Sequence, residues 1–244
     1  MIRTTADGPV RVVTIDRPER RNALRPTDLD DLAAAVSGVD PAETPVVYLR
    51  GADGQFCAGA DLDSVADLSD PEAFARRGQR VANEISDAPA VVVAGVDGAA
   101  RGGGVEMALA CDVRVATPEA TFAEPGVEFG LFGAWGGTVR LPRVVGEGEA
   151  MDFALSGRVV DAAEARRMGL VSRVVENPRA VADEIAANRP DALRVVKERL
   201  RDDADDESRE RAEAAAFARL HGRYVDDIRR ARTGEEAEDE ASDG

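Results

Sequence analysis

The stretch DGAARGGGVE, at residues 97–106, sets three consecutive glycines between a buried strand and a helix. The apolar run AVVVAGV at 90–96 precedes it and is typical of a strand that is covered on both faces. A helical pattern follows the glycines to residue 110, and a short strand pattern lies at 113–115. This order predicts a unit of strand, glycine loop, helix and strand.

The same alternation extends toward the amino terminus, with strand patterns at 10–15 and 45–49 and helical patterns at 28–38 and from Asp70 onward. After about residue 145 the strand patterns nearly vanish and helical patterns prevail. We therefore predict an α/β fold with repeated crossovers. Its expected parts are a core at 1–190, a C-terminal helical region at 191–232 and an acidic, disordered tail at 233–244.

The bulk properties indicate a soluble protein. No apolar run approaches the roughly 20 residues that a membrane helix needs, and the first residues carry no apolar leader core. We therefore expect the cytoplasm as its location. Cys57 and Cys111 lie in apolar or glycine-rich segments without metal-ligand spacing, so neither a disulfide framework nor a metal site is predicted.

The charge is strongly acidic, with 47 Asp and Glu against 31 Lys and Arg and a net charge of −16. Such a surface repels nucleic acids and anionic membranes, so neither is expected as a partner. Lys197 is the single lysine, which leaves arginine to carry the other basic positions. This composition favours a halophilic protein, and the alternative is an acidic protein from a GC-rich genome.

The glycines of the 97–106 stretch leave backbone amides open to a ligand. The first amides of a helix have no intrahelical acceptor and attract negative charge. Glu106 lies three residues after Gly103, on the same helix face, so a carboxylate and an anion-binding amide would meet over one substrate. Neither this loop nor the loop at 56–62 fits a P-loop or a dinucleotide fingerprint.

Together with FCAGADL at 56–62, the segment GGGVEMALACD at 102–112 resembles the two signature segments of the enoyl-CoA hydratase/isomerase (crotonase) family. Three more segments match in the family's order, at 15–24, 136–146 and 156–171. The resemblance covers about residues 8–200. It implies the crotonase-like (ClpP/crotonase) α/β spiral of ββα turns, with a helical C-terminal region that assembles a homotrimer or hexamer.

The resemblance also implies the site. The amides of Ala58 and Gly103 would form an oxyanion hole for a thioester oxygen, and Glu106 would be the catalytic carboxylate. Substrate binding is implied for a further set, namely Arg21, Ala23, Ala60, Asp61, Leu62, Gly126 and Trp135. Two alternatives stay open, because Glu106 could be an ordinary dipole-stabilising glutamate and Trp135 could equally fill the core.

One position departs from the family's pattern. Hydratases of the family carry a second glutamate where this chain has Gly126, which puts a two-carboxylate mechanism in doubt. Glu124 and Glu128 lie two positions to either side. Either could reach into the site and substitute for the missing glutamate, but in so acidic a chain we expect both to be surface carboxylates. If the missing carboxylate limits hydration, Gly126→Glu should raise it, provided that the backbone tolerates a side chain.

The resemblance implies proton chemistry on an acyl-CoA thioester in fatty acid metabolism. Water addition to a 2-enoyl-CoA ranks first, a lyase reaction. An enoyl-CoA isomerase or another single-glutamate reaction is the alternative. A non-catalytic acyl-CoA-binding or RNA-binding relative ranks last. No metal or redox cofactor is expected, because coenzyme A arrives as part of the substrate.

Overall fold

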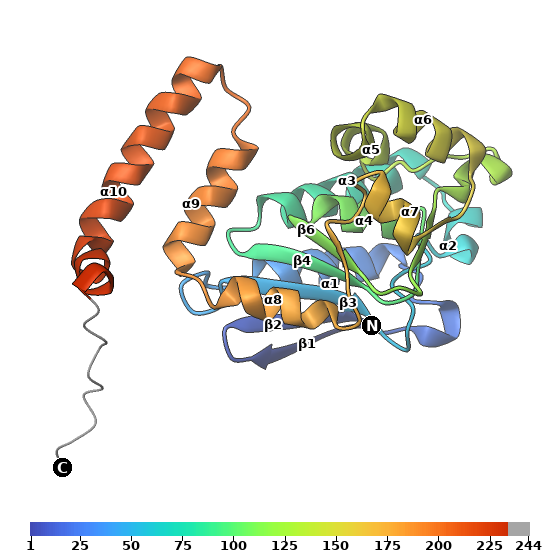
Figure 1. Ribbon diagram of the computed structural model, residues 1–244. Helices are drawn as coiled ribbons and strands as arrows, with labels where there is room; N and C mark the ends of the chain where they lie inside the picture. The colour runs from blue at the N-terminus through green and yellow to red at the C-terminus, as the bar shows by residue number, and fades with distance from the viewer. Residues whose placement is uncertain (234–244) are drawn as a thin grey trace, which may run out of the picture. The chain divides into compact units, whose positions relative to one another are not determined.

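The computed structural model describes residues 1–233, and its largest element is a six-stranded sheet (Figure 1). The strands follow the order β1-β2-β3-β4-β6-β9, with bounds Ile2–Asp7, Val10–Ile15, Val46–Gly51, Val91–Val96, Val113–Ala116 and Arg173–Val174. β1 and β2 form an antiparallel hairpin, and the remaining neighbours are parallel. The predicted α/β architecture with crossovers is confirmed.

The chain winds as a spiral, and a second, smaller sheet joins its successive turns. β4 leads into β5 (Ala99–Arg101), and β6 leads into β7 (Thr121–Ala123), which pairs with β5 in parallel and with β8 (Val160–Asp161) antiparallel. Cys57 forms an isolated parallel bridge with Ala100 of β5. Three successive turns of the chain therefore bring their ends side by side in this sheet.

Helices return the chain between strands. They are α1 (Pro26–Ser37), α2 (Leu62–Ala66), α3 (Pro71–Asp87), α4 (Gly103–Ala110), α5 (Gly137–Val145), α6 (Glu147–Ser156), α7 (Ala162–Arg167) and α8 (Pro178–Ala186), with short 3-10 helices at Pro18–Arg20 and Pro125–Phe129. The helix predicted at 28–38 begins earlier, at Pro26. The carboxylate of Asp28 accepts from the backbone N–H of Arg25, 2.8 Å away, which fixes the helix start there.

Both faces of the central strands β3 and β4 are buried, which explains their continuous apolar runs. Along β3, Val47 and Leu49 point into the main core with α1, α3 and α4, while Val46 and Tyr48 point into a second cluster with α8. The site described below lies where the smaller sheet meets α4.

The chain divides into two compact units, Met1–Arg194 and Val195–Gly244. In its described part, the second unit consists of the end of α9 (Pro190–Arg201) and of α10 (Asp206–Thr233). α10 leaves Phe217 and Ile228 exposed. The tail predicted at 233–244 lies outside the described residues, apart from Thr233. The role of the C-terminal helices in assembly stays a prediction.

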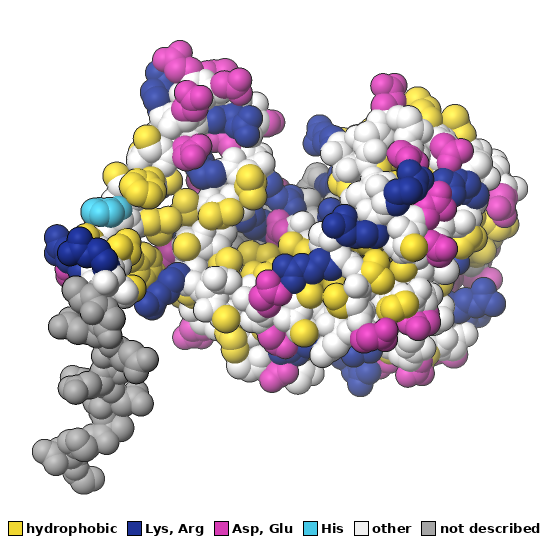
Figure 2. Space-filling model, in the orientation of Figure 1, with side chains coloured by type: hydrophobic (Ala, Val, Ile, Leu, Met, Phe, Trp, Pro, Cys, Tyr) yellow, Lys and Arg dark blue, Asp and Glu magenta, His cyan; other side chains and the backbone are white. Residues whose placement is uncertain are grey.

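On the face that Figure 2 shows, acidic and basic side chains are interspersed. Many of them pair; Arg158, for example, contacts Asp152 at 2.7 Å and Glu164 at 2.9 Å. Exposed pairs of this kind contribute about 0–1 kcal/mol each. Within residues 1–233, no helix combines the length and apolarity needed to span a bilayer.

Candidate active site

The ends of three spiral turns surround one cavity of about 610 Å³. The Cys57–Ala100 bridge and the β5–β7 pairing hold the turns in register, and the N–H of Gly102 donates to the carbonyl of Ala123 at 3.0 Å. The segments that follow these contacts line the cavity, together with apolar side chains, at Ala58, Ala60, Gly103, Glu124 and Gly126. The fold thus brings together residues that the sequence separates by more than sixty positions.

α4 begins at the cavity with an unpaired amide. Gly102 has a φ of 49°, and Gly103 is the first residue of the helix, so its N–H has no intrahelical acceptor and donates to none of the described residues. Gly59 has a φ of 88°, and a Cβ on it would lie 2.9 Å from the Gly103 nitrogen. The 56–62 loop therefore passes directly over the start of α4, which only glycine permits at this point.

The prediction that the Ala58 amide forms the oxyanion hole together with the Gly103 amide is wrong. The Ala58 N–H already donates to the carbonyl of Arg21 at 3.0 Å. Two residues later the chain forms a parallel bridge with Leu24, in which the carbonyl of Gly59 and the N–H of Asp61 are the bonded groups. This pairing leaves the Ala60 N–H without an acceptor among the described residues. Ala60 and Gly103 therefore each present an open amide at the cavity.

Glu106 lies within the cavity, one turn into α4, with its side chain only 2% exposed. Its Oε1 accepts from the N–H of Trp135 at 2.7 Å and from the N–H of Gly137 at 2.6 Å. Burial raises the pKa of Glu106 to about 7, against the lowering effect of these two amides and of Arg140. A carboxyl with this pKa can give and take protons near neutral pH.

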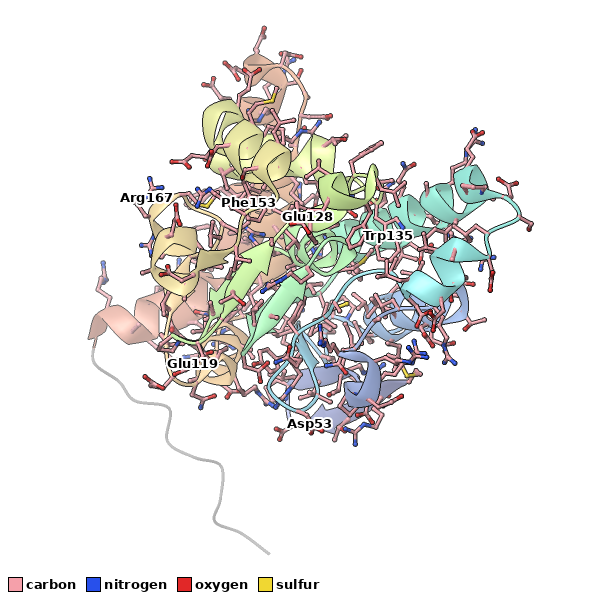
Figure 3. The ribbon with its side chains drawn as sticks, turned by 90° about the vertical axis from the view of Figure 1, so that its right-hand side faces the viewer. Asp53, Glu119, Glu128, Trp135, Phe153 and Arg167 are labelled. Atoms are coloured by element: carbon pink, nitrogen blue, oxygen red, sulfur yellow. The ribbon has the colours of Figure 1, made fainter. Side chains whose placement is uncertain are left out.

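Glu124 is a second buried carboxyl in the same cavity, and the expectation that it is a surface group is wrong. Its side chain is 7% exposed, and neither of its oxygens accepts a hydrogen bond from the described residues. Burial, together with the nearby charge of Glu106, raises the pKa of Glu124 to about 8. Glu128, labelled in Figure 3, is exposed as expected and does not line the cavity.

Trp135 both lines the cavity and fills the main core, so its two predicted roles coincide. The indole packs against two glycines of different helices, Gly78 of α3 and Gly103 of α4. A Cβ on Gly78 would come within 2.0 Å of the ring and a Cβ on Gly103 within 2.2 Å. Phe74 meets the ring edge to face, with centroids 5.6 Å apart. The wall of the cavity is therefore closely packed beside the open amide of Gly103.

Gly126 lines the cavity, but it has no room for the glutamate that the family's hydratases carry there. A Cβ at this position would lie 2.9 Å from Cα of Phe132 and 3.1 Å from the carbonyl oxygen of Leu131. Both contacts are with backbone, which cannot rotate aside as a side chain would. The backbone around residue 126 therefore does not tolerate a glutamate side chain, and Gly126→Glu is no longer expected to raise hydration.

Five of the seven residues predicted to bind the substrate line a smaller adjoining cavity of about 330 Å³. They are Arg21, Ala23, Ala60, Asp61 and Leu62. Arg21, Ala58, Ala60 and Leu62 also line the larger cavity, so the two cavities share one wall. Arg20 adds a second guanidinium to this surface, where it pairs with Asp63 at 3.0 Å.

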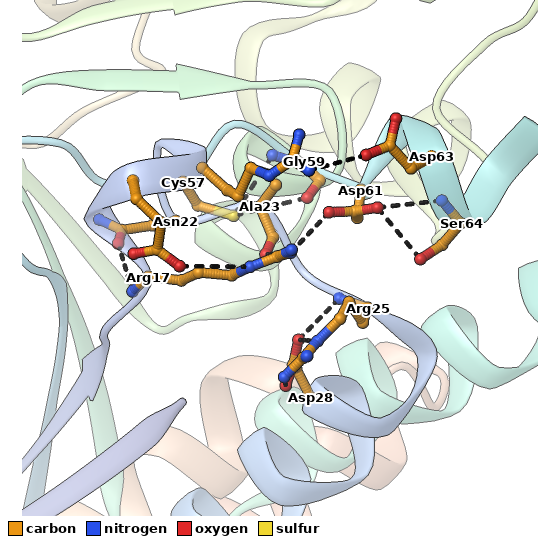
Figure 4. A network of polar contacts seen from close by, with 12 residues as sticks. Arg17, Asn22, Ala23, Arg25, Asp28, Cys57, Gly59, Asp61, Asp63 and Ser64 are labelled. Carbon is orange, nitrogen blue, oxygen red and sulfur yellow. Dashed lines mark hydrogen bonds and ion pairs between the residues drawn. The ribbon is translucent and has the colours of Figure 1, made fainter.

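Asp61 has a structural role that the sequence did not indicate (Figure 4). Its Oδ2 accepts from Nη1 of Arg17 at 2.5 Å, and its Oδ1 accepts from the N–H of Ser64 at 2.9 Å, where it caps α2. The Ser64 amide first, and then the Arg17 guanidinium, lower the pKa of Asp61. This network ties the first turn to the 56–62 loop. Arg17 was not singled out for a site role from the sequence, because it acts through contacts that are distant along the chain.

Comparison with known proteins places this geometry in a family. The model of the family described as enoyl-CoA hydratase/isomerase matches residues 5–237. A crotonyl-CoA hydratase of Syntrophomonas wolfei is 41% identical over 169 residues, covering 68% of this chain and 65% of its own. A short-chain-enoyl-CoA hydratase of Clostridium acetobutylicum is 35% identical over 204 residues, with coverages of 80% and 78%.

A solved structure supports the same assignment. The crystal structure of enoyl-CoA hydratase from Thermoplasma volcanium superimposes with a TM-score of 0.85 at 30% identity, over 91% of this chain and 92% of that one. The expected crotonase-like spiral is thereby confirmed. The protein described here belongs to the enoyl-CoA hydratase/isomerase family.

Proposed function

We propose that the protein is an enoyl-CoA hydratase, a lyase that adds water across the double bond of a 2-enoyl-CoA thioester. One observation carries the proposal. A buried carboxyl, Glu106, lies in the same cavity as the open amides of Ala60 and Gly103. Named hydratases among its relatives, for short-chain enoyl-CoA and crotonyl-CoA, support the same substrate class.

The two amides bind the thioester oxygen and stabilise the enolate that forms when water adds. Such donors contribute roughly 3 kcal/mol each to the transition state, because they are fixed before charge develops. The α4 dipole adds to the amide of Gly103. Glu106 takes a proton from the attacking water, and the amides of Trp135 and Gly137 hold its Oε1 in place.

The coenzyme A portion of the substrate occupies the adjoining cavity. Arg20 and Arg21 lie there to pair with its phosphates, while Ala23 and Leu62 offer apolar contacts. The acyl chain extends past Trp135 and Phe74, which line the larger cavity. The reaction as proposed needs no metal or redox cofactor, because both protons move between carboxyls, water and carbon.

Isomerisation of a 3-enoyl-CoA is the second candidate, and Gly126 is the observation that favours it. The family's second carboxylate is absent from that position, and one glutamate is enough to move a proton between two carbons. The two reactions share the oxyanion site and Glu106. They differ in whether water joins the product.

Assembly, location and salt requirement are further parts of the proposal. We infer a homotrimer or hexamer in the cytoplasm; the exposed Phe217 and Ile228 of α10 support assembly. A place in fatty acid metabolism follows from the acyl-CoA substrate. Halophily is supported by the net charge of −16.

The test supplies a panel of 2-enoyl-CoA and 3-enoyl-CoA thioesters and identifies the products by mass and retention. Loss of the conjugated enoyl absorbance follows hydration. We expect hydration of a short 2-enoyl-CoA, and a loss of turnover of about 10²–10⁴-fold in Glu106→Gln with acyl-CoA binding retained. Near-native turnover of Glu106→Gln would remove that residue from the mechanism. Conversion of 3-enoyl to 2-enoyl thioesters without hydration would move the assignment to isomerase.

A further inference from the structure

A buried carboxyl without partners needs an explanation, because polar groups removed from water are nearly always hydrogen-bonded. Among the described residues, Glu124 is the carboxyl group with both oxygens buried and unbonded. Leaving such a group unpaired costs the fold free energy. Its position in the cavity lining indicates that its partner is a bound substrate or water.

Glu124 faces Glu106 across a small gap that Gly133 keeps open. A Cβ on Gly133 would lie 3.0 Å from the carboxyl carbon of Glu106 and 3.0 Å from Oε2 of Glu124. The two carboxyl groups therefore lie no further apart than twice that distance. Any side chain at 133 would occupy the space between them, so glycine there preserves a carboxyl pair.

The local backbone explains how a residue two positions before Gly126 reaches the site. The bond from the Gly102 N–H to the Ala123 carbonyl holds the chain against the start of α4, and Pro125 then begins a 3-10 helix. Glu124 is the residue between these two constraints. Its carboxyl enters the cavity, while the Cα–Cβ direction of Gly126 meets the backbone of Phe132.

We propose that Glu124 is the second acid–base group of the reaction and supplies, from position 124, the carboxyl that Gly126 lacks. This inference rests on the proposed hydration. Water forms a bond from its oxygen to C3 of the enoyl group while Glu106 takes its proton, and the π electrons of the double bond move onto the thioester oxygen held by the two amides. As this enolate collapses, the Glu124 carboxyl gives its proton to C2. The proton then returns from Glu106 to Glu124, so one water has been added and both groups are restored.

The division of roles follows from the surroundings of each group. Two amides donate to Glu106, which stabilises its ionised form, whereas Glu124 receives no donor and has Glu106 as its charged neighbour, so its neutral form is favoured. Arg140 of α5 acts on Glu106. Arg101, which also lines the cavity, donates to the carbonyls of Ala100 and Thr121 and leaves the pair unbridged.

The experiment compares the full-length protein with Glu124→Gln, Glu124→Asp and the control Glu128→Gln, whose side chain is exposed outside the cavity. Hydration of 2-butenoyl-CoA is followed between pH 5 and 10, and binding of the unreactive butanoyl-CoA reports on the folded site. We expect Glu124→Gln to lower kcat by about 10²–10⁴-fold with little change in KM, and to lose the alkaline limb of the pH profile. Glu124→Asp should keep that limb with partial activity, and the control should match the native enzyme.

Three results would overturn the inference, and they are distinguishable. If Glu124→Gln keeps native kcat and the alkaline limb while Glu106→Gln loses activity, the protein is a hydratase that works with one carboxyl. If the native protein hydrates no 2-enoyl-CoA, the proposed function fails and the inference fails with it. A loss of butanoyl-CoA binding in Glu124→Gln equal to its loss of activity would assign Glu124 to shaping the cavity and not to proton transfer.

Discussion

Replacing Glu124 by Gln should make the protein more stable, by an amount that grows with pH. The native carboxyl is buried without a partner, and its pKa is raised from 4.5 to about 8. Below about pH 4.5 it is protonated in the folded and unfolded chain alike, so it does not affect stability. As pH rises toward 8, the unfolded chain loses this proton while the folded chain retains it. Folding therefore becomes less favourable across that window.

The size of this gain in stability follows from the pKa shift of Glu124. Each pKa unit corresponds to about 1.4 kcal/mol, which sets a ceiling of about 5 kcal/mol above pH 8. Relaxation of the cavity and entry of water reduce it, and we expect about 2–3 kcal/mol. A gain of this size in a chain of 244 residues raises the melting temperature by about 4–12 °C. Near pH 5 the gain should be under about 1 kcal/mol.

Denaturant unfolding at pH 5, 6, 7 and 8 measures this difference, at one protein concentration and one high salt concentration. Those conditions hold subunit assembly and charge screening constant. Glu128→Gln is the matched control, since Glu128 is exposed on the neighbouring 3-10 helix and its difference from the native protein should not widen with pH. A constant or shrinking difference for Glu124→Gln would refute the picture of a buried, unpaired carboxyl.

Three further outcomes follow from the structure. Gly126→Glu should lower stability without raising hydration, because its Cβ would lie 2.9 Å from Cα of Phe132; thermal melting and the hydration assay check this. Asp61→Asn removes one partner of the buried ion pair with Arg17 and should cost about 3 kcal/mol in urea unfolding, whereas an unchanged midpoint would mean that the pair contributes little. Salt raised from 0.1 M to 1 M shortens the Debye length from about 10 Å to about 3 Å and should raise the melting temperature and favour assembly. Light scattering and melting curves that do not change with salt would exclude the salt requirement.

The sequence alone predicted the structural features that depend on the local spacing of residues. Three glycines before an apolar helical pattern predict an exposed helix start, and the three-residue interval from Gly103 to Glu106 predicts a shared face. Continuous apolar runs indicated strands buried on both faces, and the structure has them in β3 and β4. These properties are set within a few residues of the chain, so they can be read before the fold is known.

Tertiary structure alone decided which groups are available for chemistry. The Ala58 N–H donates to the carbonyl of Arg21, whereas the Ala60 N–H has no acceptor among the described residues. This difference arises because Leu24 pairs with the 56–62 loop in one particular register. Glu124 is buried because distant turns of the spiral close over it, although an acidic composition predicts exposure. Availability of a donor and desolvation of a carboxyl both depend on which segments meet in space. Contacts between remote parts of the chain determine which donors are available and which carboxyls are buried, and a local sequence pattern does not predict those contacts.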